Sequence, residues 1–129
     1  MPGLMPAPAA RLNTTEAAVL TKATGRIAEY LDLTNAALAR VLGVSEATAS
    51  RVRSGAYALK TGSKEAELAV LLIRLFRGLD AIVGGDMTAA RSWFRTRNLA
   101  LLGIPAELVQ TVTGLTASVA YVDALRARV

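Results

Sequence analysis

Apolar residues recur at three- and four-residue spacings along most of the chain, which is the pattern of amphipathic helices. No stretch alternates between apolar and polar residues as a half-buried strand would, and no internal repeat is visible. We therefore predict an all-α fold. The predicted helices span residues 14–31, 35–42, 46–54, 64–83, 88–95, 105–111 and 116–128.

The ends of several predicted helices are marked by capping residues. Thr34, Ser45 and Ser63 stand where a side-chain oxygen can accept from the first free amides of a helix. Gly43 and Gly55 stand where a helix can end in a left-handed turn. Residues 1–13 contain three of the four prolines and little periodicity. They predict a flexible tail, followed by one helical unit over residues 14–62 and another over residues 63–129.

The longest predicted helix, residues 64–83, is apolar over more than one face. Val70, Ile73 and Phe76 lie outside its main apolar face, which suggests burial on more than one side. Two explanations remain open at equal weight: a homodimer or partner contact, or a central core helix. The main face consists of Leu68, Leu71, Leu72, Leu75, Leu79, Ile82 and Val83.

Composition excludes several chemistries. The chain has 129 residues, no cysteine and no histidine, which rules out disulfides, thiol nucleophiles and the usual general base at neutral pH. We therefore predict that the protein is not an enzyme and has neither a metal nor a cofactor. The net charge of +5 favours an anionic partner but does not identify one.

Targeting signals are not evident in the sequence. The first ten residues lack the basic and apolar regions of a signal peptide. The most apolar segment, residues 68–83, contains Arg74, Arg77 and Asp80, so we expect no membrane span. These features predict a cytoplasmic protein.

The segment from Leu38 to Val52 has the spacing of a DNA-binding helix-turn-helix. Ala39 is small where two helices would cross, Gly43 makes the turn, and Ala49 and Val52 point inward. From residue 47 to residue 64 there are four basic residues and no acid. The candidate DNA-binding residues are Ser45, Glu46, Ala47, Thr48, Ser50, Arg51, Arg53 and Lys60.

Individual roles follow from the chemistry of these side chains. Arg51 can bond a guanine edge or a phosphate, and Glu46 can accept from a cytosine amino group. Arg53, Lys60 and Lys64 suit phosphate contacts. The pattern over residues 38–55 resembles the Xre/Cro type of helix-turn-helix. A helical hairpin that only docks another protein is the competing interpretation.

A second group of motifs follows residue 84. The stretch RSWFRTRNLALLGIP, residues 91–105, resembles a basic and aromatic nucleic-acid surface in composition alone. The motif skeleton of this region consists of Trp93, Asn98, Gly103 and Pro105 within the stretch and Glu107 just after it. A Thr-Gly break and a final amphipathic helix follow. We expect these residues to be structural, with Trp93 anchoring the small domain.

The order of these motifs resembles the toxin-binding domain of the Xre/MbcA/ParS antitoxin family. The family commonly has leucine after the tryptophan and proline before the asparagine, where this chain has Phe94 and Arg97. The surface around Arg95 and Arg97 could therefore be specialised, in contact either with a toxin or only with water.

The resemblance implies a protein partner and a function. Members of the family are encoded beside RES- or ParT-type toxins that act on NAD, and they neutralise these toxins by direct contact while binding operator DNA. The C-terminal end is implied to block the toxin active site, and Arg126 and Arg128 could occupy a pocket for the NAD diphosphate. The competing interpretation is that both arginines only offset the helix dipole. The implied toxin-binding residues are Tyr121, Leu125, Arg126, Arg128 and Val129.

Two other functions remain possible on the sequence. One is a stand-alone Xre-type transcriptional regulator whose C-terminal part dimerises or senses a ligand, and the other is an adaptor that no longer binds DNA. A two-fold symmetric operator and the apolar helix 64–83 both favour a homodimer, which would form a larger hetero-oligomer with the toxin.

Overall fold

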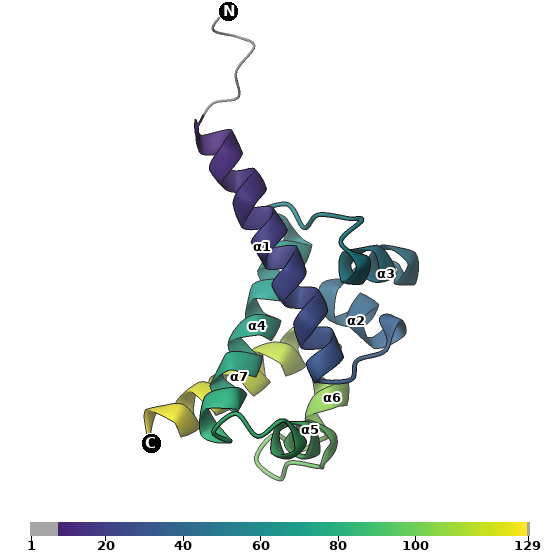
Figure 1. Ribbon diagram of the computed structural model, residues 1–129. Coiled ribbons are helices and arrows are strands. Elements are labelled where there is room, and N and C mark those ends of the chain that lie inside the picture. Colours follow the sequence, from purple (N-terminus) through teal and green to yellow (C-terminus); the bar gives the residue numbers. More distant parts are fainter. Residues whose placement is uncertain (1–7, 129) are drawn as a thin grey trace, which may run out of the picture.

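A computed structural model describes residues 8–128 of the chain, with side chains from Thr15 onward. This part of the chain forms seven helices and no strand, which confirms the predicted all-α fold (Figure 1). The helices are α1 (Pro8–Tyr30), α2 (Asn35–Leu42), α3 (Glu46–Ser54), α4 (Lys64–Ile82), α5 (Met87–Arg95), α6 (Pro105–Leu108) and α7 (Val112–Ala127).

The capping residues hold the helix ends as the sequence predicts. Side chains of Thr34, Ser45 and Ser63 accept hydrogen bonds from the third backbone amide that follows each of them. Gly43 and Gly55 adopt left-handed conformations and end α2 and α3. These signals are local, so the bounds of α2 and α3 agree with the prediction.

The first and last helices differ from the prediction at their N-terminal ends. The first helix begins at Pro8 instead of Thr14, so residues 8–13 are helical rather than part of a flexible tail. Proline is well suited to the first turn of a helix because its missing amide would have no partner there. Residues 1–7 of the predicted tail lie outside the described residues.

The last helix begins at Val112 instead of Thr116, and α6 is correspondingly shorter than predicted. The side chain of Thr111 accepts from the amide of Gly114, 3.1 Å away. The Thr-Gly pair therefore caps α7 rather than interrupting it. Gly114 lies in the first turn, where its missing side chain leaves room for the carbonyl oxygen of Leu108.

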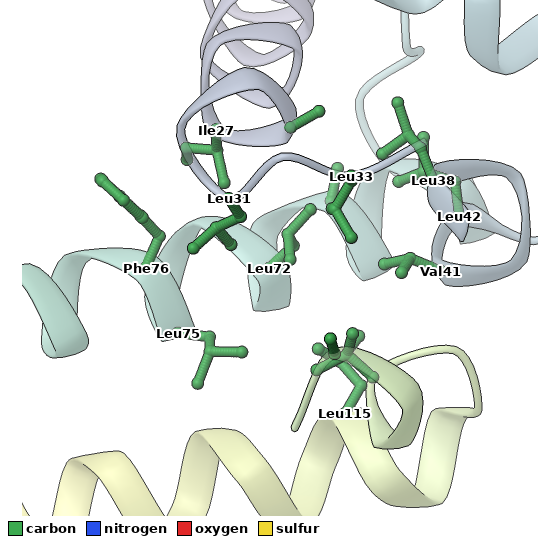
Figure 2. Packing of buried hydrophobic residues seen from close by; sticks show 14 of the residues in the cluster. Ile27, Leu31, Leu33, Leu38, Val41, Leu42, Leu72, Leu75, Phe76 and Leu115 are labelled. Atoms are coloured by element: carbon green, nitrogen blue, oxygen red, sulfur yellow. The ribbon is translucent and has the colours of Figure 1, made fainter. Parts of the chain in front are cut away.

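The fourth helix is the centre of the molecule, in contact with α1, α2, α5 and α7. Figure 2 shows Leu72, Leu75 and Phe76 on this helix between residues of α1 and Leu115 of α7. This arrangement favours the core-helix explanation for its broad apolar surface. It also unites the two predicted units, because one buried cluster runs through both of them.

On α4 and α1, the burial of some side chains does not follow the spacing of the apolar residues. Phe76 is buried and stacks on Tyr30, although the pattern placed it outside the main face, whereas Val70 is exposed. On α1 the inner face includes Thr21 and Thr24, whose hydroxyl groups donate to carbonyl oxygens one turn earlier. The hydroxyl of Thr21 also accepts from the amide of Leu59 at 2.8 Å. Because this local bond satisfies the hydroxyl group, a threonine can be buried on the inner face of a helix.

Candidate nucleic-acid and toxin interfaces

The third helix presents one polar face to solvent. Glu46, Ala47, Ser50 and Arg51 are exposed on it, while Ala49 and Val52 are buried against the neighbouring helices. The buried pair fixes the rotation of α3 about its axis. Four of the predicted DNA-binding residues therefore share one outward face.

The N-terminal end of α3 is held by a small hydrogen-bond network. The Ser45 hydroxyl accepts from the amide of Thr48 at 3.1 Å and donates to its side-chain oxygen at 3.0 Å. Both residues are consequently engaged in the cap, and Thr48 is half-buried. They support the outward face from its edge instead of projecting from it.

Arg53 lies on the inner edge of α3. Its guanidinium donates to the carbonyl oxygen of Leu33, and its Nε is buried without a hydrogen-bond partner among the described atoms. The backbone of this residue also approaches Gly25 of α1 closely. The sequence did not predict this role in joining α3 to the turn after α1, which sets Arg53 apart from the outward-facing group.

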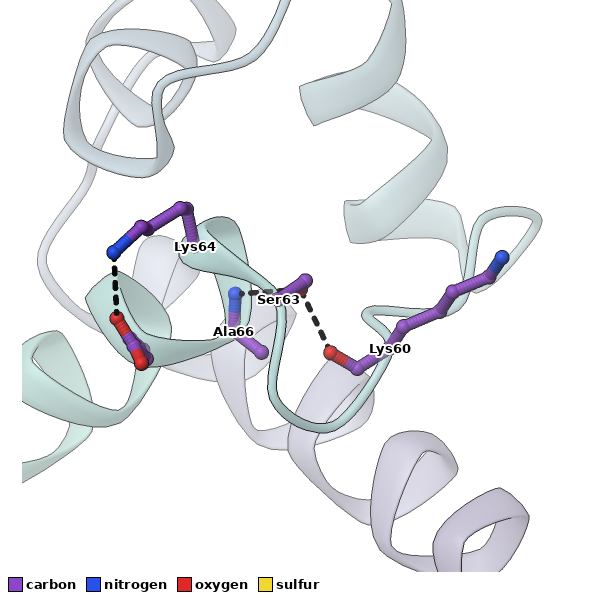
Figure 3. Close-up of polar contacts among 5 residues, drawn as sticks. Lys60, Ser63, Lys64 and Ala66 are labelled. Carbon is purple, nitrogen blue, oxygen red and sulfur yellow. Dashed lines mark hydrogen bonds and ion pairs between the residues drawn. The ribbon is translucent and has the colours of Figure 1, made fainter. Parts of the chain in front are cut away.

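The loop between α3 and α4 carries the remaining lysines. Figure 3 shows the side chains of Lys60 and Lys64 extending away from each other, on either side of the Ser63 cap. Lys60 is exposed, whereas the ammonium of Lys64 lies 3.8 Å from the carboxylate of Glu67. Lys60 is the less compensated positive charge of the two.

Tyr57 connects the same loop to the start of α4. Its hydroxyl donates to Glu65 Oε1 at 3.2 Å, and this bond, with the negative charge of Glu65, raises the pKa of Tyr57. Both effects favour the protonated phenol, which is the form that donates this hydrogen bond. This contact helps fix the loop that follows α3.

Two arginines of the stretch 91–105 bind the end of α1. Arg91 Nε donates to the carbonyl oxygen of Tyr30 at 2.7 Å, and Arg95 donates to those of Leu31 and Asp32. Helix C-terminal carbonyls lack partners and carry partial negative charge, so they attract cations. The basic character of α5 is therefore explained in large part by contacts inside the molecule.

Trp93 on the same helix is half-buried and stacks on Tyr121 of α7. The ring centroids are 6.5 Å apart and the planes are inclined by 15°. The indole joins α5 to the last helix, as expected for an anchor of this region. Tyr121, one of the predicted toxin-binding residues, is thereby fixed in place.

The segment that follows α5 forms a tight loop between Asn98 and Gly103. Each backbone amide of this pair donates to the carbonyl oxygen of the other, at 2.8 and 3.3 Å. Asn98 Oδ1 also accepts from the amide of Leu101 at 2.9 Å. These bonds form a turn at Asn98, and Pro105 occupies the first turn of α6, which begins at the residue where the sequence places it. Glu107 is exposed in that helix.

The C-terminal end of α7 leads away from the core. Val119 and Val122 are buried, Leu125 is half-buried, and Arg126 and Arg128 are exposed. An ion pair between Arg74 and Asp123, 2.6 Å apart, fixes the helix to α4 just before this point. The structure thus separates the predicted toxin-binding residues into an anchored part and a projecting part; Val129 lies outside the described residues.

Two features relevant to other functions are missing from residues 8–128. No group of three or more acidic residues there is arranged to hold a metal ion. No helix in the same range is long and apolar enough to cross a membrane.

Comparison with known families assigns the two halves of the chain to two domain families. Residues 10–74 match a family model described as the antitoxin Xre-like helix-turn-helix domain. Residues 78–128 match one described as the antitoxin Xre/MbcA/ParS C-terminal toxin-binding domain. A search of curated proteins found no match to the chain. The two matched ranges meet inside α4, the helix that both halves share.

Proposed function

The chain belongs to the Xre/MbcA/ParS antitoxin family, and from this membership we propose that it neutralises a RES- or ParT-type toxin that acts on NAD. The same protein represses its own operon by binding operator DNA through α3. The observation that supports both activities most directly is that α3 and the C-terminal end of α7, which both carry exposed polar side chains, lie on opposite sides of a body with one buried core (Figure 1).

DNA binding uses the outward face of α3 in the major groove. Glu46, Ala47, Ser50 and Arg51 face solvent together, and Arg51 is the one cation among them. Ser45 and Thr48 hold the N-terminal end of the helix, which approaches the bases first in this motif. Lys60 supplies a phosphate contact nearby, whereas Arg53 would first have to release the carbonyl of Leu33.

Replacing Arg51 with alanine should weaken operator binding by about 1–3 kcal/mol, because a bidentate base contact or a phosphate contact is lost. A gel-shift titration with the upstream DNA at fixed salt measures this change. Arg126→Ala is the matched control, since it removes the same charge from an exposed position on α7, outside the surfaces proposed to contact DNA or a second copy. Equal affinities for the two variants would show that Arg51 contributes only its charge.

Toxin neutralisation uses the projecting end of α7. Arg126 and Arg128 are exposed there beyond the last buried residues, so they are available to enter a site that binds the NAD diphosphate. The stacking of Trp93 on Tyr121 holds α7 against α5 before the projecting end begins. The end of α7 thereby blocks the entrance to the toxin active site.

Deleting residues 124–129 should reduce toxin affinity at least about tenfold, equal to about 1.4 kcal/mol, and abolish protection of co-expressing cells. Cell survival and NAD content give the readout in cells, and calorimetry gives the affinity. The full-length double variant Arg126→Ala/Arg128→Ala separates loss of the two charges from loss of the last turn. Full protection by the truncated chain would refute the blocking role.

We further propose that the protein forms a homodimer that assembles with the toxin. A groove of about 310 Å³ between α1 and α4 is lined by Val19, Tyr30, Ile73 and Phe76 among others, which supports a contact between copies. Co-purification with the adjacent gene product, followed by mass measurement, tests both contacts. A protein that binds its operator but retains no adjacent product would be the stand-alone regulator.

A further inference from the structure

The loop between Asn98 and Gly103 places two leucines in solvent. Leu99 is 81% exposed and Leu102 is 76% exposed, the highest values among the large hydrophobic residues of the described chain. Isolated exposed leucines are common, but two on one short loop form a concentrated apolar surface. We call Leu99 and Leu102 the leucine tip.

The leucine tip stands on a rigid base. The reciprocal backbone bonds between Asn98 and Gly103 close the loop, and the side chain of Asn98 fixes the amide of Leu101 inside it. Leu101 itself is half-buried, so it ties the middle of the loop to the body of the protein. These bonds keep the backbone of the loop closed before any partner arrives, which lowers the entropic cost of binding.

A second contact fixes the base from the other side. Gly103 lies against Leu108 of α6, where an added Cβ would come within 3.0 Å of the leucine side chain. Because glycine allows this approach, the loop packs directly on the helix that follows. The tip therefore cannot fold back to cover its own apolar side chains without breaking that packing.

The backbone of Leu102 adopts an unfavourable conformation. Its φ angle is 59°, in the left-handed region where a leucine is disfavoured and glycine or asparagine is preferred. A leucine that is both strained and exposed contributes little to the fold of the free protein. Strain of this kind is commonly found at binding sites, where the side chain is needed by a partner.

We infer that the leucine tip is a docking element that inserts into an apolar cleft on the surface of the cognate toxin. This inference rests on the proposed toxin-binding function and adds a second contact to the one at the end of α7. The tip lies within residues 78–128, the range matched by the toxin-binding domain. Arg97, exposed beside the tip, fits an acidic group at the rim of such a cleft.

The position of the tip is compatible with simultaneous DNA binding. In Figure 1, α5 and the connection that follows it lie at the lower edge of the molecule, whereas α3 lies on its right side, above them. A toxin held at the lower edge leaves the outward face of α3 open.

The test compares toxin affinity and thermal stability of purified full-length variants, with the product of the adjacent gene as the binding partner. Leu102→Gly should raise or preserve the melting temperature, because it relieves the left-handed strain, and should weaken toxin binding about tenfold. The double variant Leu99→Ser/Leu102→Gly should lose about thirtyfold or more. A purely structural role for Leu102 predicts lower stability and unchanged affinity.

Two further variants serve as controls. Val70→Ser removes an exposed apolar side chain from α4, outside the tip, and should leave toxin affinity within about twofold of wild type. Leu99→Met keeps an apolar side chain of similar size and should retain tight binding. Operator affinity of all four variants should equal that of the wild type.

Three results would overturn the inference. Toxin affinities within threefold of wild type for both tip variants would remove the docking role while leaving toxin binding itself intact. Loss of toxin binding together with a change in the mass of the free protein would assign the tip to a contact between copies. A wild-type protein that binds its operator but not the adjacent product would overturn the proposed toxin-binding function, and the docking role with it.

Discussion

Replacing Phe94 with alanine should lower the free energy of unfolding by about 3–5 kcal/mol, the usual cost of removing a buried aromatic side chain. Phe94 is the largest fully buried side chain of the described chain, and it lies on α5, which contacts α4 and α6. The cost combines lost burial with the cavity that neighbouring side chains fill only in part. Urea denaturation followed by circular dichroism measures the change.

Two variants give this result its controls. Phe94→Leu keeps much of the apolar volume and should cost about 1–2 kcal/mol, because a smaller cavity remains. Ser92→Ala changes an exposed residue of the same helix and should stay within about 0.5 kcal/mol of the wild type. A loss below 1 kcal/mol for Phe94→Ala would mean that α5 does not depend on the core for its position.

Replacing Gly114 with alanine should destabilise the protein by about 3 kcal/mol, at the upper end of what overpacking usually costs. The added Cβ would lie 1.9 Å from the carbonyl oxygen of Leu108, far inside contact distance, and the obstacle is backbone rather than a movable side chain. The backbone cannot easily move away to relieve this clash, because the residues on both sides of it are buried. Val109 and Leu115, which flank the turn, are completely buried.

The alanine variant of Thr113 is the matched control for Gly114→Ala. Thr113 is the preceding residue in the same turn and is exposed, so Thr113→Ala should change stability by less than about 0.5 kcal/mol. Hydrogen exchange of α7 amides adds a local readout, since Gly114→Ala should increase exchange there first. If Gly114→Ala is as stable as the wild type, α6 and α7 can move apart at this point without loss of stability.

The helix-turn-helix could be predicted in detail because its determinants lie close together in the sequence. The caps Thr34 and Ser45, the glycine turn at Gly43 and the buried pair Ala49 and Val52 act within a few residues of one another. Caps and glycine turns of this kind are specified by residues that are near one another in the sequence. The bounds of α2 and α3 and the outward face of α3 agree with the prediction for this reason.

The region after α5 was predictable as a series of motifs but not as a surface. Asn98, Gly103 and Pro105 form the turn and helix start that their residue types favour. The left-handed conformation of Leu102 had no signal, because leucine normally avoids it. Only the tertiary structure shows that Leu102 has this left-handed conformation and an exposed side chain.

Contacts over long sequence distances were decided by the tertiary structure. Arg91 and Arg95 resemble a nucleic-acid surface in the sequence, yet they donate to carbonyl oxygens at the end of α1, more than sixty residues earlier. Arg53 likewise lies beside the outward-facing group in sequence but bonds Leu33 inside the fold. A guanidinium fits a phosphate and a helix C-terminus equally well, so residue type could not distinguish the two.

By itself, the sequence determined the helical class, the order of the helices and the helix-turn-helix, because periodicity and caps depend on near neighbours. The tertiary structure decided which further positions of α1 and α4 are buried. Phe76 and Thr21 became core residues while Val70 and Val19 remained exposed. Burial depends on which helices happen to pack on a given face, and α4 is surrounded by four others that the spacing of its own apolar residues does not identify.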